Sequence, residues 1–286
     1  MTVAVARNPY ATNVSGSLIA AAGRLGVPVR PVDLPSLRLG IGPRGKEAVT
    51  DSAGPVVADS LAPYLLFGFP AAVHALRALA RTTHAQNPVD GVLLADDKAA
   101  AAYRLARAGV PQVRTEICPF DAGLVTAVAA ELGYPVVVKR AHGAQGRWVR
   151  RAESQQALAT ALAELAAEGP GALIVQPEVV ECAGTSIRAV VTGGRLLAVT
   201  ERQATAPEWR SNIAGGAVQR RAELTGEEAE LVRGATVALA LGHAGVDILR
   251  TRQGPRVLEV NACPDFTSMQ PHYEADLGEA VLRASG

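Results

Sequence analysis

The chain has 286 residues, 49% hydrophobic and 19% charged, which is the composition of an ordinary globular protein with room for about two domains. Its 28 Lys and Arg residues nearly balance its 27 Asp and Glu residues, so no global basic field would attract nucleic acid or an anionic membrane. The start of the sequence lacks the pattern of a signal peptide, no apolar run is long enough to span a membrane, and the 3 cysteines lack metal-binding or redox spacing. We therefore expect a cytoplasmic protein with reduced thiols.

The first third of the chain alternates short apolar runs with helical patterns. We expect strands over 3–6, 27–32 and 55–58, and helices over 71–80 and over 15–25, the latter with Ser15 as its N-cap. Because strands and helices alternate, this part predicts a small parallel α/β domain, to which we assign residues 1–97.

A segment rich in Gly, Pro and Ser, residues 36–54, interrupts this pattern. It contains Gly40-Ile41-Gly42-Pro43-Arg44-Gly45, which has the G-x-G-x-x-G spacing of a dinucleotide-binding turn. That turn requires a following amphipathic helix, and the residues after Gly45 predict none. We therefore expect a mobile loop here, in preference to the cofactor site of an NAD(P)-dependent dehydrogenase.

The rest of the chain predicts an α+β organisation, which we divide into a central region, 98–175, and a C-terminal region, 176–286. For the central region the pattern predicts helices over 96–108, 122–132 and 154–168, and strands over 113–117, 135–139, 148–150 and 172–176. For the C-terminal region it predicts a hairpin of 187–191 and 195–201, a helix over 225–241, a second hairpin of 246–250 and 256–261, and a helix over 274–283.

Charged residues beside apolar strands indicate phosphate chemistry. Lys139 ends an apolar strand and precedes the glycine-containing segment 143–147, and glycine lets backbone N–H groups approach phosphate oxygens closely. Asp247, Glu259 and the Asn261 carbonyl would share one face at one end of the second hairpin, an oxygen cage that suits Mg²⁺; solvated charges are the alternative. Further cations that could meet a phosphate are Lys98, Arg188, Arg202 and Arg210.

The order of these motifs resembles the ATP-grasp ligases, in particular the group that contains RimK and LysX. The motifs that carry the resemblance include Asn87-Pro88, Asp97-Lys98, Gly133-Tyr134-Pro135-Val136-Val137-Val138-Lys139, Glu178-Val179-Val180-Glu181, Trp209-Arg210-Ser211-Asn212, Val246-Asp247 and Glu259-Val260-Asn261. The resemblance implies an ATP-grasp fold, α+β, preceded by a small parallel α/β (pre-ATP-grasp) domain. The chain departs from it at Ser186, where relatives have Asp, and in the segment after Asn261.

The resemblance implies a role for each matching residue, with ATP and Mg²⁺ as cofactors and Mn²⁺ as an expected substitute. Nucleotide phosphates would be bound by Lys98, Lys139 and the loop residues Gly143, Gln145, Gly146 and Arg147. The adenine would meet the hinge Glu178, Val179 and Val180, and the ribose would meet Glu181. The catalytic residues would be Lys139, Arg202 and Arg210, with Asn212, Ser186 and Arg188 also at the nucleotide, and the metal ligands would be Asp247, Glu259 and Asn261.

The implied reaction joins a carboxylate to the amine of an amino acid through an acyl phosphate, with release of ADP and phosphate. The carboxylate would belong to a small molecule or a carrier protein, nucleic acid and membranes are not expected as partners, and relatives suggest a homodimer or homotetramer. One alternative is a LysX-like ligase of amino-acid biosynthesis, whose acidic carrier protein would dock on Arg147, Arg150 and Arg151. A second alternative is a nucleotide-binding protein without ligase activity, which the serine at position 186 would indicate.

Overall fold

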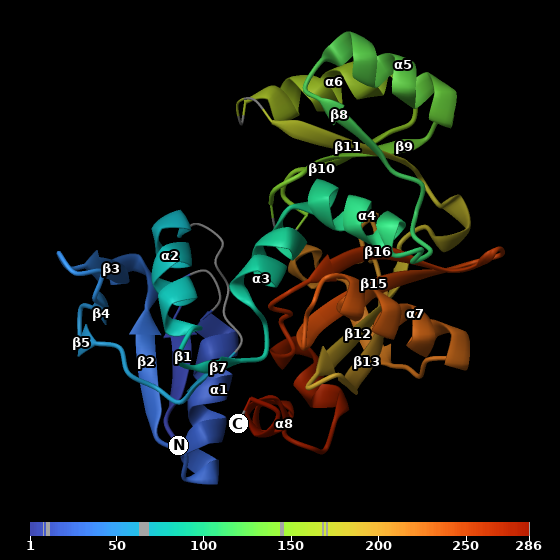
Figure 1. Ribbon diagram of the computed structural model, residues 1–286. Helices are drawn as coiled ribbons and strands as arrows, with labels where there is room; N and C mark the ends of the chain where they lie inside the picture. Colours follow the sequence, from blue (N-terminus) through green and yellow to red (C-terminus); the bar gives the residue numbers. More distant parts are fainter. Residues whose placement is uncertain are drawn as a thin grey trace.

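The computed structural model describes residues 1–7, 9, 12–62, 69–143, 146–167, 169 and 171–285, and Figure 1 shows their arrangement in three regions. The N-terminal region contains a parallel sheet of order β2-β1-β6-β7. Its strands are β1 (Val3–Arg7), β2 (Val29–Asp33), β6 (Ser60–Leu61) and β7 (His84–Ala85), with helices α1 (Thr12–Leu25) and α2 (Pro70–Leu79). The prediction of a small parallel α/β unit is therefore confirmed.

Two details of this region differ from the prediction. Helix α1 begins at Thr12, so Ser15 lies inside the helix and donates its hydroxyl to the Thr12 carbonyl at 3.2 Å. The third parallel strand is β6 and not 55–58, because Gly54–Pro55 forms β5 in a separate antiparallel sheet. A short apolar run predicts a buried strand, but it cannot show which neighbouring strand that strand will pair with.

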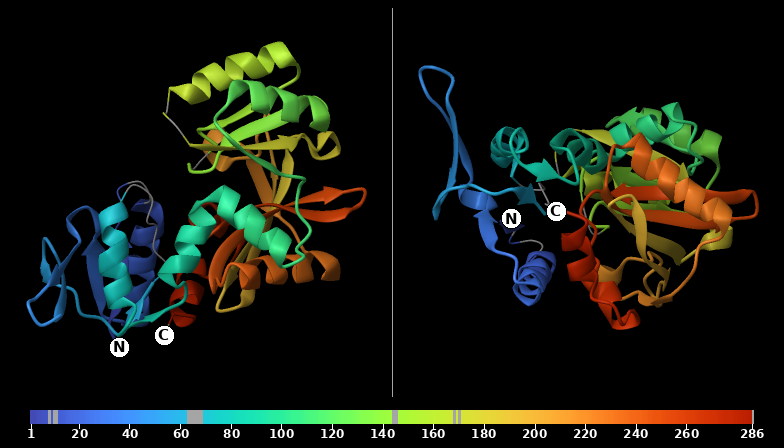
Figure 2. Two further views of the ribbon diagram at one scale, coloured as in Figure 1. Left: turned by 45° about the horizontal axis from the view of Figure 1, so that its top comes forward. Right: turned by 60° about the horizontal axis from the view of Figure 1, so that its bottom comes forward.

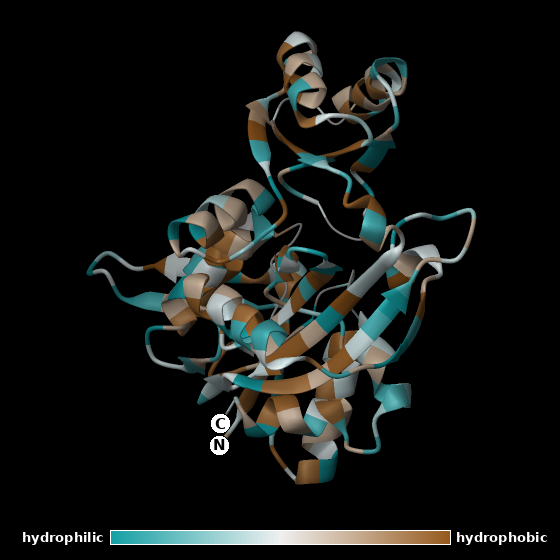
Figure 3. Cartoon of the chain, turned by 90° about the vertical axis from the view of Figure 1, so that its right-hand side faces the viewer, coloured by the Kyte–Doolittle hydropathy of each residue, from teal (hydrophilic) through white to brown (hydrophobic). Residues whose placement is uncertain are grey.

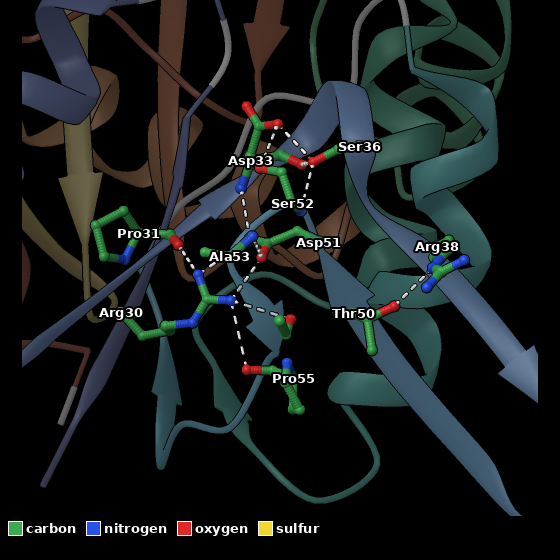
Figure 4. A network of polar contacts seen from close by, with 11 residues as sticks. Arg30, Pro31, Asp33, Ser36, Arg38, Thr50, Asp51, Ser52, Ala53 and Pro55 are labelled. Carbon is green, nitrogen blue, oxygen red and sulfur yellow. Dashed lines mark hydrogen bonds and ion pairs between the residues drawn. The ribbon is translucent and has the colours of Figure 1, made fainter.

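The expectation of a loop over 36–54 is wrong, because this segment forms a hairpin that projects from the N-terminal region (Figure 2). Strands β3 (Arg38–Ile41) and β4 (Glu47–Asp51) pair antiparallel, and the G-x-G-x-x-G spelling falls on the end of β3 and the turn after it. A buried carboxylate holds the base of the hairpin: Asp51 Oδ1 accepts from Arg30 at 2.6 Å, and Asp51 Oδ2 accepts from the Asp33 amide at 3.0 Å (Figure 4).

The central region is an antiparallel sheet of order β10-β9-β11-β8 with two helices on one face. Its elements are β8 (Glu116–Pro119), α5 (Ala122–Leu132), β9 (Val136–Arg140), β10 (Val149–Ala152), α6 (Gln155–Ala166) and β11 (Ala172–Pro177). Leu158, Leu165 and Leu173 are fully buried between sheet and helices. The opposite face of this sheet turns toward the C-terminal region (Figures 1 and 2).

The C-terminal region is built on an antiparallel sheet of order β14-β13-β12-β15-β16. Its elements are β12 (Thr185–Thr192), β13 (Arg195–Gln203), β14 (Val218–Arg221), α7 (Gly226–Ala238), β15 (His243–Thr251), β16 (Gly254–Asn261) and α8 (Leu277–Arg283). Both predicted hairpins are present, and hydrophobic residues recur along these strands while the outer turns are hydrophilic (Figure 3). Helix α8 packs on α1, which joins the last helix of the fold to the N-terminal region.

Two helices connect the N-terminal region to the rest of the chain. The helix predicted over 96–108 is present as α4 (Lys98–Arg107), and Asp97 is its N-cap, with a carboxylate that accepts from the Ala99 and Ala100 amides. The helix before it, α3 (Val89–Asp96), was not predicted. Strand β8 begins at Glu116, three residues later than expected. The domain boundaries after 97 and 175 stay predictions; the first falls at this N-cap and the second inside β11. None of the helices that the structure describes is both long and apolar enough to cross a membrane.

Candidate active site

A cleft of about 550 Å³ lies between the central sheet and the C-terminal sheet, with the start of α1 at its edge. It collects most of the residues that the sequence singled out, although they are spread over more than half of the chain. The predicted site residues that line it are Lys98, Lys139, Gly143, Gly146, Arg147, Glu178, Val179, Arg188, Arg202, Arg210, Asn212, Asp247, Glu259 and Asn261. Gln145 lies outside the described residues.

Strand pairing aligns charged side chains across the C-terminal sheet. Arg188 on β12 is opposite Asp247 on β15, which is opposite Glu259 on β16. Asp247 and Glu259 lie within their strands, toward the end of the hairpin opposite its turn, where Asn261 is the last residue of β16. Arg188 donates from Nη2 to Asp247 Oδ2 at 2.5 Å and from Nε to Oδ1, and Arg202 Nη1 lies 3.7 Å from Oδ1. Asp247 is therefore held by two arginines.

Burial and mutual charge shift the pKa values of this group. Burial would raise the pKa of Asp247, but Arg188 outweighs it and holds the pKa below its ordinary value. Burial together with repulsion from Arg188 lowers the pKa of Arg202 to about 10. All three side chains consequently stay charged near neutral pH, in a place where few water molecules screen them.

Two lysines face this row from the other side of the cleft. Lys139, on β9, is buried, and its burial lowers its pKa while nearby Glu259 acts in the opposite direction. Lys98, the first residue of α4, donates to the Gly143 carbonyl and lies 3.4 Å from Glu259 Oε1. Both ammonium groups are thus directed at the space between the two sheets, next to the glycine loop.

The glycine loop touches a second loop that follows β13. Arg210 Nη1 donates to the Gly146 carbonyl at 2.6 Å. Both loop glycines have positive φ, and a Cβ at Gly146 would lie 2.5 Å from Asn212 Nδ2, so a larger residue would separate the loops. Arg147 stacks on Trp148 with 4.7 Å between its Cζ and the ring centroid. The central and C-terminal regions are therefore in direct contact through these two loops.

Glu208 holds the arginine of this contact. Its Oε1 accepts from the Trp209 amide, the Arg210 amide and Arg210 Nε, each at 2.9 Å, and its Oε2 accepts from Arg210 Nη2 at 2.7 Å. The hydrogen bonds from Arg210 lower the pKa of Glu208 to about 2. With Nε and Nη2 occupied, Nη1 is the group that is free to reach Gly146.

A family model described as the RimK-like ATP-grasp domain matches residues 95–284. The chain belongs to this family. It is 39% identical over 194 residues to a probable alpha-L-glutamate ligase of Pectobacterium carotovorum subsp. carotovorum (strain PC1), which covers 67% of this chain and 63% of that protein. It is 35% identical over 190 residues to the ribosomal protein bS6–L-glutamate ligase of Escherichia coli O7:K1 (strain IAI39 / ExPEC), covering 66% and 63%. The matched part thus spans less than two thirds of the length of these relatives.

Solved structures agree with this family in fold. A RimK domain protein from Sphaerobacter thermophilus DSM 20745 has a TM-score of 0.72 at 23% identity, over 100% of this chain and 99% of that one. The D-alanine–D-alanine ligase of Bacillus anthracis has a TM-score of 0.69 at 15% identity, over 99% and 96%. The expected ATP-grasp fold is confirmed, and the family resemblance inferred from the motifs is confirmed with it.

Three predicted residues of this RimK-like chain lie outside the lining of the cleft. Val180 is exposed, and Glu181 accepts from the Arg252 amide at 2.8 Å and pairs with its guanidinium at 3.0 Å. Ser186 is buried, and its hydroxyl lies 2.7 Å from that of Ser211, so it fastens the loop after β13 to β12. A neutral hydrogen bond therefore occupies the position at which the resemblance of the motifs predicts Asp.

The oxygen donors of the cleft fit a hard divalent cation in their chemistry. Asp247, Glu259 and Asn261 supply two carboxylates and an amide, all on adjacent strands. Among the described residues there is no group of three or more His, Cys, Asp or Glu that could hold a metal, so the set depends on the Asn261 amide. The role of these three residues as ligands stays a prediction.

Two residues in or beside the cleft had no role in the sequence reasoning. Glu208 contacts Arg210, which lines the cleft, and its position two residues before a predicted site arginine is the signal that could have identified it. Asp265 lies in the segment after Asn261 and lines the cleft. The spacing of residues in the sequence cannot show what the Glu208 and Asp265 side chains contact, because these contacts depend on how the backbone turns.

Proposed function

We propose that this protein is an ATP-dependent ligase that joins a carboxylate to the amine of an amino acid, forming ADP and phosphate. The observation that carries the proposal is one cleft in which two lysines and the Arg188–Asp247–Arg202 group surround Glu259 and Asn261. Phosphoryl transfer needs positioning and charge neutralisation more than a protein nucleophile, and this set of residues provides both. Membership of the RimK-like family and the names of the two ligase relatives support the same class of reaction.

In this proposal each charged group has a separate task. Lys98 and Lys139 bind nucleotide phosphate oxygens, and Gly143 to Arg147 cover them. Mg²⁺, or Mn²⁺ in its place, would be held by Asp247, Glu259 and Asn261 and would neutralise phosphate charge. Arg202 and Arg210 face the oxygen atoms of the transferred group, and the substrate carboxylate becomes an acyl phosphate that the amine attacks.

Closure of the two loops would protect the acyl phosphate from water. Arg210 binds the Gly146 carbonyl from the C-terminal region, and Glu208 orients Arg210 for this contact. Adenine is assigned to the hinge at Glu178 to Val180, where the Glu178 side chain is already bonded to Arg151 Nε at 2.8 Å and leaves the backbone for recognition. The ribose contact of Glu181 would require it to leave Arg252.

The carrier-protein alternative receives little support from the charges on the central sheet. Arg150 Nε lies 2.5 Å from Glu164 Oε2, and Arg151 Nε lies 2.8 Å from Glu178 Oε2, so two of the three proposed docking arginines are paired. We therefore favour a small molecule or peptide as the carboxylate. A homodimer or homotetramer stays a prediction.

The test is ADP release with purified protein, ATP and Mg²⁺, over a panel of carboxylates and the twenty amino acids. We expect release that requires both substrates. Asp247→Asn should reduce turnover by about 100-fold or more, since it removes a charge at the reacting phosphates. Asp90→Asn is the matched control, because Asp90 is 79% exposed on α3. ADP release that ignores both substrates, or an Asp247→Asn protein with normal turnover, would contradict the proposal.

A further inference from the structure

The carboxylates that line the cleft differ in whether they are paired. There are four of them among the described lining residues: Glu178, Asp247, Glu259 and Asp265. The first three each form an ion pair, with Arg151, Arg188 and Lys98 respectively. Asp265 has no ion-pair partner within the part of the chain that the structure describes. Among the described lining carboxylates it is therefore the one that is neither ion-paired nor assigned to the metal.

The turn around Asp265 holds the carboxylate in a defined orientation. Asp265 Oδ1 accepts from the Thr267 amide at 2.9 Å and from Thr267 Oγ1 at 2.6 Å, and the residue is exposed to the cleft. Both bonds go to the same oxygen, so Oδ2 keeps its hydrogen-bonding capacity. Because the turn is fixed by these bonds, a ligand would not have to order this side chain on binding.

A second polar group lies on the same wall. Ser268 belongs to the 3₁₀ helix Thr267–His272 and also lines the cleft. Its Oγ is buried and has no hydrogen-bond partner among the described residues, whereas its backbone carbonyl accepts from Gln219 Nε2. Buried hydroxyl groups are normally hydrogen-bonded, so the Ser268 hydroxyl has unused hydrogen-bonding capacity beside the cleft.

The charges near Asp265 define what kind of ligand fits. Arg188 and Arg202 are close enough to Asp265 for its negative charge to act on both guanidinium groups. A site that holds both guanidinium groups and a carboxylate without an ion pair suits a reaction between an anionic group and an amine that arrives as an ammonium ion. No other unpaired carboxylate among the described lining residues could receive that ammonium ion.

We propose that Asp265, together with Ser268, forms the subsite for the ammonium group of the amino acid that this ligase joins to its carboxylate substrate. The inference rests on the proposed function and deepens it. The ammonium ion gives one proton to Asp265, and the free amine forms the C–N bond with the acyl carbon. The C–O bond to phosphate breaks with its electrons on the leaving phosphate, which takes the second proton from the nitrogen and departs as hydrogen phosphate. Asp265 binds and positions the amine, and its Oδ2 is the acceptor for the departing proton.

The experiment compares two nucleophiles in the wild type and in Asp265→Asn. The asparagine keeps an oxygen for Thr267 and removes the negative charge. With the carboxylate found in the ADP-release panel, the KM is measured for the amino acid, which is an ammonium ion, and for hydroxylamine, which is uncharged at neutral pH. In Asp265→Asn, we expect the fold increase in KM to be at least ten times larger for the amino acid than for hydroxylamine.

Further variants separate recognition from folding. Ser268→Ala should raise the amino-acid KM severalfold, and Asp90→Asn, on the exposed surface of α3, should leave both KM values unchanged. Equal changes for the two nucleophiles, or no change in either, would overturn the assignment of Asp265. A wild type that releases no ADP with hydroxylamine or with any amino acid would instead refute the proposed ligase activity, so the two failures are distinguishable.

Discussion

Removal of the Glu208 carboxylate tests whether the loop after β13 acts as a clamp on the glycine loop. In Glu208→Ala, Arg210 loses both side-chain contacts that orient its guanidinium, and two backbone amides lose their acceptor. The Arg210 contact with the Gly146 carbonyl then depends on a freely rotating side chain. Glu208→Gln keeps a carbonyl acceptor but loses the charge, so its effect should be smaller.

The size of the effect follows from the exposure and charge of the pair. The side chains are 19% and 29% exposed, which places the ion pair between a surface pair and a buried one. Bonds to charged groups contribute about 1.5–3 kcal/mol each, and partial exposure reduces this to about 1–2 kcal/mol for the contact with Gly146. Nucleotide affinity should therefore fall roughly five- to thirtyfold in Glu208→Ala.

The assay is ATP affinity by calorimetry, together with KM for ATP and the melting temperature of each variant. Glu230→Gln is the matched control, because Glu230 forms an ion pair with Arg233 at 2.5 Å on the exposed face of α7. We expect the ATP affinity of Glu208→Ala to fall while its melting temperature stays within a few degrees of that of the control. Unchanged ATP affinity in a stably folded Glu208→Ala protein would refute the clamp.

Three further predictions concern stability and phosphate binding. Burial lowers the pKa of His243 to about 3 from an ordinary value of 6.5, so below pH 6.5 the unfolded state binds a proton that the folded state does not. In urea titrations the free energy of unfolding should therefore fall by about 2 kcal/mol from pH 6.5 to 5. The His243→Leu variant should lack this decrease. Gly242→Ala should destabilise by about 1–3 kcal/mol, because its Cβ would lie 2.6 Å from the Gln86 carbonyl oxygen, whereas Gly226→Ala, with open space around it, should not. Lys139→Met should lower kcat by about 100-fold or more, and a smaller loss in single-turnover measurements would contradict its phosphate role.

The order and type of most elements could be predicted from the sequence. The helix over 122–132 and the hairpin turned at Gly193-Gly194 agree closely with the structure, because apolar periodicity and turn glycines act locally. The segment 36–54 shows the limit of this reasoning. Its Gly and Pro residues indicate turns, but the base of the hairpin is held by the ion pair of Arg30 with the buried Asp51, two residues that are 21 positions apart in the chain.

The same distinction between local sequence signals and long-range contacts applies to the chemistry of the site. The sequence by itself determined which groups are present: two lysines at strand or helix ends, a glycine loop after the second lysine, and oxygen donors on two strands of a hairpin. The tertiary structure alone decided their partners, because Arg188 and Asp247 meet through strand pairing and not through spacing. It also placed Glu208 behind Arg210 and left Asp265 unpaired among the described residues of the cleft. Electrostatic interactions act through space, so their outcome depends on distances that only the folded chain establishes.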